Sequence, residues 1–132
     1  MSHPMHYPVD HPVVERVRGL CMRYPEAVEA IAHGRVTFRA GRRQFAIVGV
    51  AHRESPAVEF LPAEDEREAL LERADVFVPP YEGAYGWLAI EVEAVDGPWD
   101  LLEELLDSSY RRVALVRQLR ALDAAPVVAA KD

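Results

Sequence analysis

Three short runs rich in strand-forming residues, all between positions 35 and 61, constrain the fold of this chain more than any other feature. They are RVTFRA at 35–40, RRQFAIVGV at 42–50 and AVEFL at 57–61. Clean alternation, as in the first run, is typical of a strand with one buried face, and Gly41 between the first two runs is typical of a hairpin turn. The runs therefore predict consecutive antiparallel strands.

The alternation also assigns side chains to the two faces of the predicted sheet. A later segment, GWLAIEVE at 86–93, is also predicted to be a strand. In this strand and in the first run, the side chains expected on the buried face are Val36, Phe38, Ala40, Leu88, Ile90 and Val92. The opposite face should carry Arg35, Thr37, Arg39, Trp87, Ala89, Glu91 and Glu93. That second face would combine arginines, carboxylates and an indole ring.

Helical periodicity brackets the strands. Asp10 can cap a first helix, and AEDEREALLERAD at 63–75 predicts a second. Residues 98–122 predict one long closing helix, with its acids early and its arginines late. Residues 26–33 favour a further strand weakly. This order predicts an α+β fold: an antiparallel β-sheet with helices packed on one face and the other face bare.

The length of 132 residues predicts one domain. We expect a flexible N-terminal tail at residues 1–10, a single domain at 11–122 and a frayed C-terminal tail at 123–132. The single cysteine, Cys21, has no disulfide partner in the chain, which fits the cytoplasm. No apolar run reaches the length of a membrane span, and the first residues do not have the pattern of a signal peptide.

Net charge argues against a general attraction to nucleic acid. The chain has 15 basic and 22 acidic residues, a formal charge of −7. The charge is unevenly divided: residues 1–62 hold 8 Arg and 6 acids (+2), and residues 63–132 hold 7 Lys or Arg and 16 acids (−9). A basic surface in the first half is compatible with this division.

No group of residues predicts catalysis, a cofactor or a metal. His3, His6 and His11 have a spacing that a transition metal would accept, but they lie in the tail with no cluster of carboxylates or thiolates nearby. Cys21 falls on the apolar stripe of the first helix, as a small core residue does. The glycines of the chain form neither a Walker pattern nor a dinucleotide fingerprint. We therefore predict a protein that is not an enzyme.

The second sheet face allows two interpretations. In the structural one, arginines and glutamates pair across strands and Trp87 covers the arginine stems. In the functional one, an aromatic platform of Tyr81, Tyr85 and Trp87 stacks on a ligand while nearby arginines bind phosphates. Glu91, on the same face, would repel a polyanion and favours the structural interpretation. The hairpin tip at 42–43 escapes this objection.

Four segments in order resemble one family of proteins. They are LCMRYPEAVE, VTFRAGRRQFAIV, VPPYEGAYGWLAIEV and WDLLEELLDSSYRRVA. In this order and spacing the chain resembles the MmcQ/YjbR family of small bacterial proteins over roughly residues 11–120. The resemblance implies a CyaY-like, double-wing fold, an antiparallel sheet with helices against it, and a DNA-binding role. It implies no catalytic residue.

We therefore predict a non-enzymatic binding module of the MmcQ/YjbR type. The first hypothesis is weak, salt-sensitive binding of DNA through Arg39, Arg42, Arg43, Arg111 and Arg112. The alternative is a protein-interaction or small-ligand module that uses the exposed sheet face around Tyr81 and Trp87. The sequence leaves the partner and the oligomeric state open.

Overall fold

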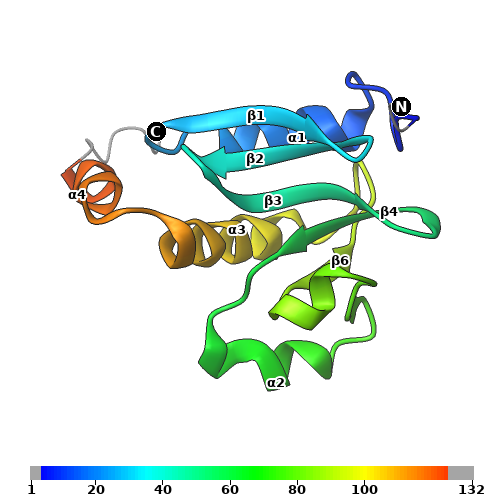
Figure 1. The fold of residues 1–132 in the computed structure, drawn as a ribbon. Helices are drawn as coiled ribbons and strands as arrows, with labels where there is room; N and C mark the ends of the chain where they lie inside the picture. Colours follow the sequence, from blue (N-terminus) through cyan, green and yellow to red (C-terminus); the bar gives the residue numbers. More distant parts are fainter. Residues whose placement is uncertain (1–3, 125–132) are drawn as a thin grey trace.

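A computed structural model describes residues 4–124 of the chain (Figure 1). The helices and helical turns are α1 (Pro12–Cys21), η1 (Glu64–Glu66), α2 (Arg67–Leu71), η2 (Glu82–Tyr85), α3 (Trp99–Val113) and α4 (Val116–Ala124). The strands are β1 (Ala27–Ala32), β2 (Arg35–Ala40), β3 (Arg43–Val50), β4 (Arg53–Phe60), β5 (Val76–Phe77) and β6 (Leu88–Glu91). They form one antiparallel sheet in the order β1-β2-β3-β4-β6-β5, so the predicted α+β fold is confirmed.

Tight turns connect the first three strands. β1 and β2 are joined through His33 (φ 53°) and Gly34 (φ 78°), and positive φ at both loop residues is the geometry of a type I′ hairpin. β2 and β3 are joined through Gly41 (φ 70°) and Arg42, which confirms the hairpin predicted at this glycine. The strand weakly favoured at 26–33 is also confirmed, as β1. These turns place Arg42 at a hairpin tip and Arg39 and Arg43 beside it.

One face of the sheet is covered by α1 and α3 and holds the main apolar core (Figure 1). The rings of Tyr24 and Phe45 pack around Tyr110, with centroids 4.6 Å and 5.2 Å from its ring. Phe45 is the extra residue of a β-bulge, because Arg39 pairs with Gln44 while Phe38 pairs with Ala46. The bulge turns the Phe45 side chain into this core, where none of its surface is exposed.

The predicted closing helix at 98–122 is wrong as a single element. α3 ends at Val113, Ala114 is extended (ψ 153°), and α4 begins at Val116. Gln118 accounts for the break, because its side chain binds a free backbone N–H at the start of α4 and attaches this helix to Glu26. Its Oε1 accepts a hydrogen bond from the Leu115 N–H at 2.7 Å, and its Nε2 donates to Glu26 at 2.8 Å.

Two smaller expectations also need correction. The helix predicted at 63–75 is confined to η1 and α2, because Leu70 alone among these helical residues is buried and anchors the segment. The N-cap of α1 is His11 rather than Asp10. The His11 Nδ1 accepts a hydrogen bond from the Val13 N–H at 3.1 Å, which occupies the capping position that a carboxylate would otherwise take.

The second face of the sheet is not bare, contrary to the sequence-based expectation. Arg35, Thr37 and Glu59 are 8%, 1% and 0% exposed. The segment 78–87, which contains η2, covers part of this face and brings Glu82 to Arg35. Alternation in a strand shows which side chains point away from the core. It does not show which loop packs over those side chains, so the sequence predicted a bare face.

The residues before α1 also contact the sheet. The His6 N–H donates to the Gly34 carbonyl at 2.7 Å, and its Nε2 donates to the Arg53 carbonyl at 2.8 Å. The Tyr7 hydroxyl donates to the Glu54 carbonyl at 3.0 Å. Gly49 has φ 102°, and a Cβ there would lie 2.9 Å from the His6 ring, so the close approach of this segment requires glycine. His3 lies outside the described residues.

Candidate nucleic-acid interface

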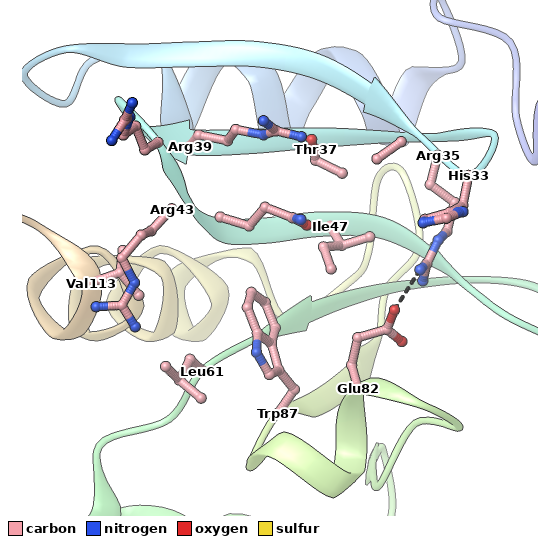
Figure 2. A pocket seen from close by; sticks show the side chains of 13 residues that line it. His33, Arg35, Thr37, Arg39, Arg43, Ile47, Leu61, Glu82, Trp87 and Val113 are labelled. Atoms are coloured by element: carbon pink, nitrogen blue, oxygen red, sulfur yellow. Dashed lines mark hydrogen bonds and ion pairs between the residues drawn. The ribbon is translucent and has the colours of Figure 1, made fainter.

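The candidate site is a cavity of about 490 Å³ on the sheet face opposite α1 and α3 (Figure 2). Its base comes from β2, from the β2–β3 hairpin and from β3, and one wall comes from the segment 78–87. The charged and polar lining residues are His33, Arg35, Thr37, Arg39, Arg42, Arg43, Gln44 and Glu82. The main apolar lining residues are Ile47, Leu61, Trp87 and Val113.

Three of the lining arginines, Arg39, Arg42 and Arg43, are called the arginine group below. Among the described residues, none of their side chains takes part in an ion pair or a hydrogen bond, and the Nε of Arg39 is buried without a partner. Six arginines elsewhere are paired with carboxylates: Arg18, Arg23, Arg53, Arg73, Arg111 and Arg117. Arg16 and Arg67 donate to backbone carbonyls. Uncompensated positive charge is therefore concentrated in this cavity, although the chain as a whole is acidic.

The structure separates the five arginines predicted to bind DNA. Arg111 lies on α3 and pairs with Asp107 at 2.9 Å and Asp123 at 3.2 Å. Arg112 donates to the Pro62 carbonyl at 2.5 Å and lies 3.7 Å from Glu64. Neither lines the cavity. Both guanidiniums are already occupied within the protein, whereas those of the arginine group are not.

The structure also separates the predicted aromatic platform. Trp87 lines the cavity and packs partly against the core. Tyr81 and Tyr85 do not line it; they are 69% and 82% exposed on η2 and the turn before it. The Tyr81 hydroxyl lies 3.2 Å from His52 Nε2, beside the β3–β4 turn. Only Trp87 therefore lies next to the arginine group.

A buried ion cluster that the sequence analysis did not identify fixes one end of the cavity. Arg35 donates to Glu59 at 2.9 Å and to Glu82 at 2.6 Å, and also to the Gly49 carbonyl at 3.2 Å. Glu59 is fully buried on β4, opposite Ala89 of β6. A charged residue between the apolar Val58 and Phe60 in a strand was the available sequence signal, because such a residue needs a buried partner.

The two carboxylates of this cluster share one positive charge. Burial raises the pKa of Glu59 to about 8, and the nearby Glu82 carboxylate adds to the increase. Glu59 therefore carries a proton at neutral pH. Its Oε1 and the Oε1 of Glu82 are buried with no hydrogen-bond partner if both groups are ionised. A proton on Glu59 supplies the missing donor, so the cluster is neutral overall when it holds this proton.

A tight turn positions Glu82. Tyr81 has φ 68° and ψ −72°, and the Glu82 N–H donates to the Pro80 carbonyl at 2.8 Å. This geometry is that of the strained γ-turn with positive φ. Pro80 restricts the backbone before the turn, and the Arg35–Glu82 pair holds the residue after it. The strained turn and the ion pair together fix the wall that carries Trp87.

Other candidate chemistry is not gathered into a site. Within residues 4–124, no group of three or more His, Cys, Asp or Glu residues has an arrangement that could hold a metal ion. His6 and His11 make the hydrogen bonds given above. Cys21 is buried in the core, and burial raises the pKa of its thiol. No helix of the described chain has both the length and the apolar character needed to cross a membrane.

These features define the class of the protein: an α+β domain with a helix-covered face and a cationic cavity on the other face. A family model adds the particular family, because the YjbR model matches residues 22–112, more than half of the chain. The chain belongs to the YjbR family, which confirms the resemblance found in the sequence. No curated protein matches the chain. The matched region includes all six strands and all but the last residue of α3, and it excludes α1 and α4.

Proposed function

We propose that this chain is a nucleic-acid-binding module whose phosphate contacts are made by the arginine group. The observation that carries the proposal is the set of three guanidiniums, without partners among the described residues, in one cavity. Guanidinium groups bind phosphate with paired, charge-assisted hydrogen bonds. The net charge of −7 opposes non-specific attraction, so binding should be local, weak and steeply dependent on salt.

The proposal is one of binding and not of catalysis. Phosphate contacts and an aromatic surface suffice to hold a nucleic acid, and no nucleophile or general base is needed for that task. The single cysteine supports a cytoplasmic location for this role, where a free thiol stays reduced.

Fluorescence anisotropy tests the proposal directly. Labelled DNA would be titrated with the full chain at 20 mM and at 150 mM salt, using the variant Arg42→Gln/Arg43→Gln and the wild-type chain. We expect the double variant to bind more weakly and to lose about 0.7–0.9 of the log–log salt slope for each arginine removed.

The matched control is Arg73→Gln/Arg111→Gln, which changes the net charge equally at two arginines that already pair with carboxylates. Its affinity should stay within about twofold of wild type, because surface charge far from the contact site is screened. Equal weakening by both double variants would mean that only net charge matters. An absence of binding at 20 mM salt would overturn the proposal.

A second candidate function is supported by the exposed apolar residues before and within η2. Val78, Tyr81 and Tyr85 are 50%, 69% and 82% exposed. Aromatic side chains in such a position suit a protein interface, as in the alternative drawn from the sequence. Sedimentation equilibrium of the wild-type chain and of Tyr81→Ser/Tyr85→Ser would test one form of it, self-association. A concentration-dependent mass that the substitutions abolish would support this use of the surface, and a wild-type chain that stays monomeric would remove self-association.

A further inference from the structure

We infer that the cavity binds single-stranded nucleic acid in preference to duplex, with one unpaired base stacked on Trp87 and the adjacent phosphates on the arginine group. This inference rests on the proposed function and specifies the form of its ligand. It depends on the position of Trp87 beside the arginine group, whereas the proposed function depends only on charge.

The arrangement of the cavity is the first support. Figure 2 shows the Trp87 ring between Arg43, on one side, and Arg35 with Glu82, on the other. At the Arg35 end the charge is already compensated by Glu59 and Glu82. A phosphate is therefore attracted to the end formed by the arginine group, and a neutral base attached to that phosphate reaches the indole ring.

The rigidity of Trp87 is the second support. The next residue, Leu88, is fully buried at the start of β6. The preceding residue, Gly86, has φ 97°, and its carbonyl accepts a hydrogen bond from Arg67 at 2.7 Å. The backbone is thus held on both sides of the indole. A ring fixed before binding loses little conformational entropy when a base stacks on it.

The size of the cavity is the third support. A volume of about 490 Å³ lies within the range of small-molecule sites and accommodates one nucleotide unit. In a duplex both faces of each base are covered by its neighbours, so an indole reaches a base face only if the base is extruded, which costs free energy. In a single strand the base is already available. The duplex and the single strand both present phosphates, so phosphate contacts alone would not distinguish them.

The test compares three labelled ligands of equal length in the anisotropy assay: a mixed-sequence single strand, its duplex, and an abasic strand that keeps the phosphates. The informative substitution is Trp87→Leu, which keeps apolar bulk against the core but removes the flat ring. Base–aromatic stacking predicts a loss of about 5- to 150-fold in single-strand affinity. Duplex and abasic-strand affinities should change less than about twofold.

Two further variants guard the interpretation. Trp87→Phe keeps a stacking surface and should recover part of the single-strand affinity. Tyr85→Ala removes an exposed aromatic outside the cavity and should have no effect. Circular dichroism and the unfolding midpoint of each variant show whether the fold is intact. Single-strand binding should also quench the fluorescence of Trp87, and the quenching should disappear in Trp87→Phe, because the other tryptophan, Trp99, is 6% exposed in the core.

The outcomes separate this inference from the proposed function. If no nucleic acid binds, both fail. If binding depends on Arg42 and Arg43 but duplex binds as tightly as single strand, or folded Trp87→Leu binds the single strand like wild type, the inference fails and the proposed function stands. A single-strand preference that Trp87→Leu removes and Trp87→Phe partly restores supports both.

Discussion

The two faces of the sheet are stabilised in different ways. On the face covered by α1 and α3, apolar side chains interlock, and a polar side chain buried among them has hydrogen-bond partners. For example, Ser109 donates to the Phe45 carbonyl at 2.7 Å and accepts from the Leu61 N–H at 2.9 Å. On the opposite face, buried charges are balanced around Arg35, and a few residues away the arginine group has no balancing charge among the described residues.

This difference separates the charges that stabilise the fold from those that the proposed function assigns to binding. Proteins pair nearly all charges that they remove from water, because an unpaired buried charge is costly. The cluster around Arg35 follows this rule and supports the cavity wall. Within the arginine group only Arg39 departs from it, because its Nε is buried without a partner, whereas Arg42 and Arg43 are exposed to water. Departures from a stability rule are concentrated at functional sites. The predictions below test this division, beginning with the largest expected effect.

Substitution of Arg35 should cause the largest loss of stability. Arg35→Met leaves the partly buried Glu82 carboxylate without its cation and the buried Glu59 without a hydrogen-bond donor, and removing one partner of a buried ion cluster costs about 3–5 kcal/mol. The measurement is urea denaturation at pH 7. Arg23→Met is the matched control, because Arg23 pairs with Glu103 and both side chains are about half exposed, so its cost should be about 0–1 kcal/mol. Equal costs for the two variants would show that the buried cluster contributes no more than a surface pair.

The second prediction is that stability depends on pH, because Glu59 is protonated in the folded chain. The pKa of Glu59 is about 8 in the folded chain against an ordinary value of 4.5. Between these pH values the folded state binds more protons than the unfolded state, so the contribution of this group to the free energy of unfolding falls as pH rises. Glu59→Gln imitates the protonated form and should remove that fall.

The free energy of unfolding of both chains would be measured at intervals from pH 5 to pH 9. We expect wild type to lose stability relative to Glu59→Gln as pH rises through this window, on the order of a few kcal/mol in total. Glu91→Gln, which alters an exposed carboxylate on β6 that pairs with Arg53, should run parallel to wild type. If Glu59→Gln also ran parallel to wild type, Glu59 would be ionised in the folded chain throughout.

The buried cluster illustrates why the sequence predicted one face better than the other. Alternation in β2 correctly separated Val36 and Phe38 from Arg35 and Thr37, because the pleat alone decides this. It could not predict that the segment 78–87 folds back onto the second face, since that depends on the γ-turn at Tyr81 and on the Arg35–Glu82 pair. Burial of Arg35 was therefore missed.

The third prediction concerns the helix-covered face and a hydrogen bond. Ser109 joins α3 to the ends of β3 and β4, and it is fully buried. Ser109→Ala leaves the Phe45 carbonyl and the Leu61 N–H without this partner, at a cost of about 1–3 kcal/mol. Ser108→Ala is the matched control at the preceding position of α3. Ser108 makes no side-chain hydrogen bond with the described residues, and loss of its hydroxyl should cost less than about 0.5 kcal/mol. Equal unfolding midpoints for the two variants would contradict a structural role for the Ser109 hydroxyl.

The candidate site was only partly predictable for a related reason. Arg39, Arg42 and Arg43 could be placed together, because one hairpin carries all three. The addition of Trp87 to the same cavity was one of two interpretations left open by the sequence. Arg111 and Arg112 were grouped with them by charge alone, and the sequence could not show that α3 and its neighbours already supply their partners. Separation of paired from unpaired arginines required the long-range contacts of the fold.

The last prediction has the smallest effect and tests the division most directly. If the arginine group is kept for binding, neutralising Arg42 and Arg43 should not destabilise the chain, because no partner within the described residues is lost. Mutual repulsion should even decrease, so Arg42→Gln/Arg43→Gln should raise the free energy of unfolding slightly, within about 0.5 kcal/mol, and the gain should shrink at high salt. Denaturation at 20 mM and 500 mM salt measures both quantities. The double variant that is expected to weaken binding would then be at least as stable as wild type. A loss of stability would mean that these arginines support the fold, and the contrast between the two clusters of charge on this face would disappear.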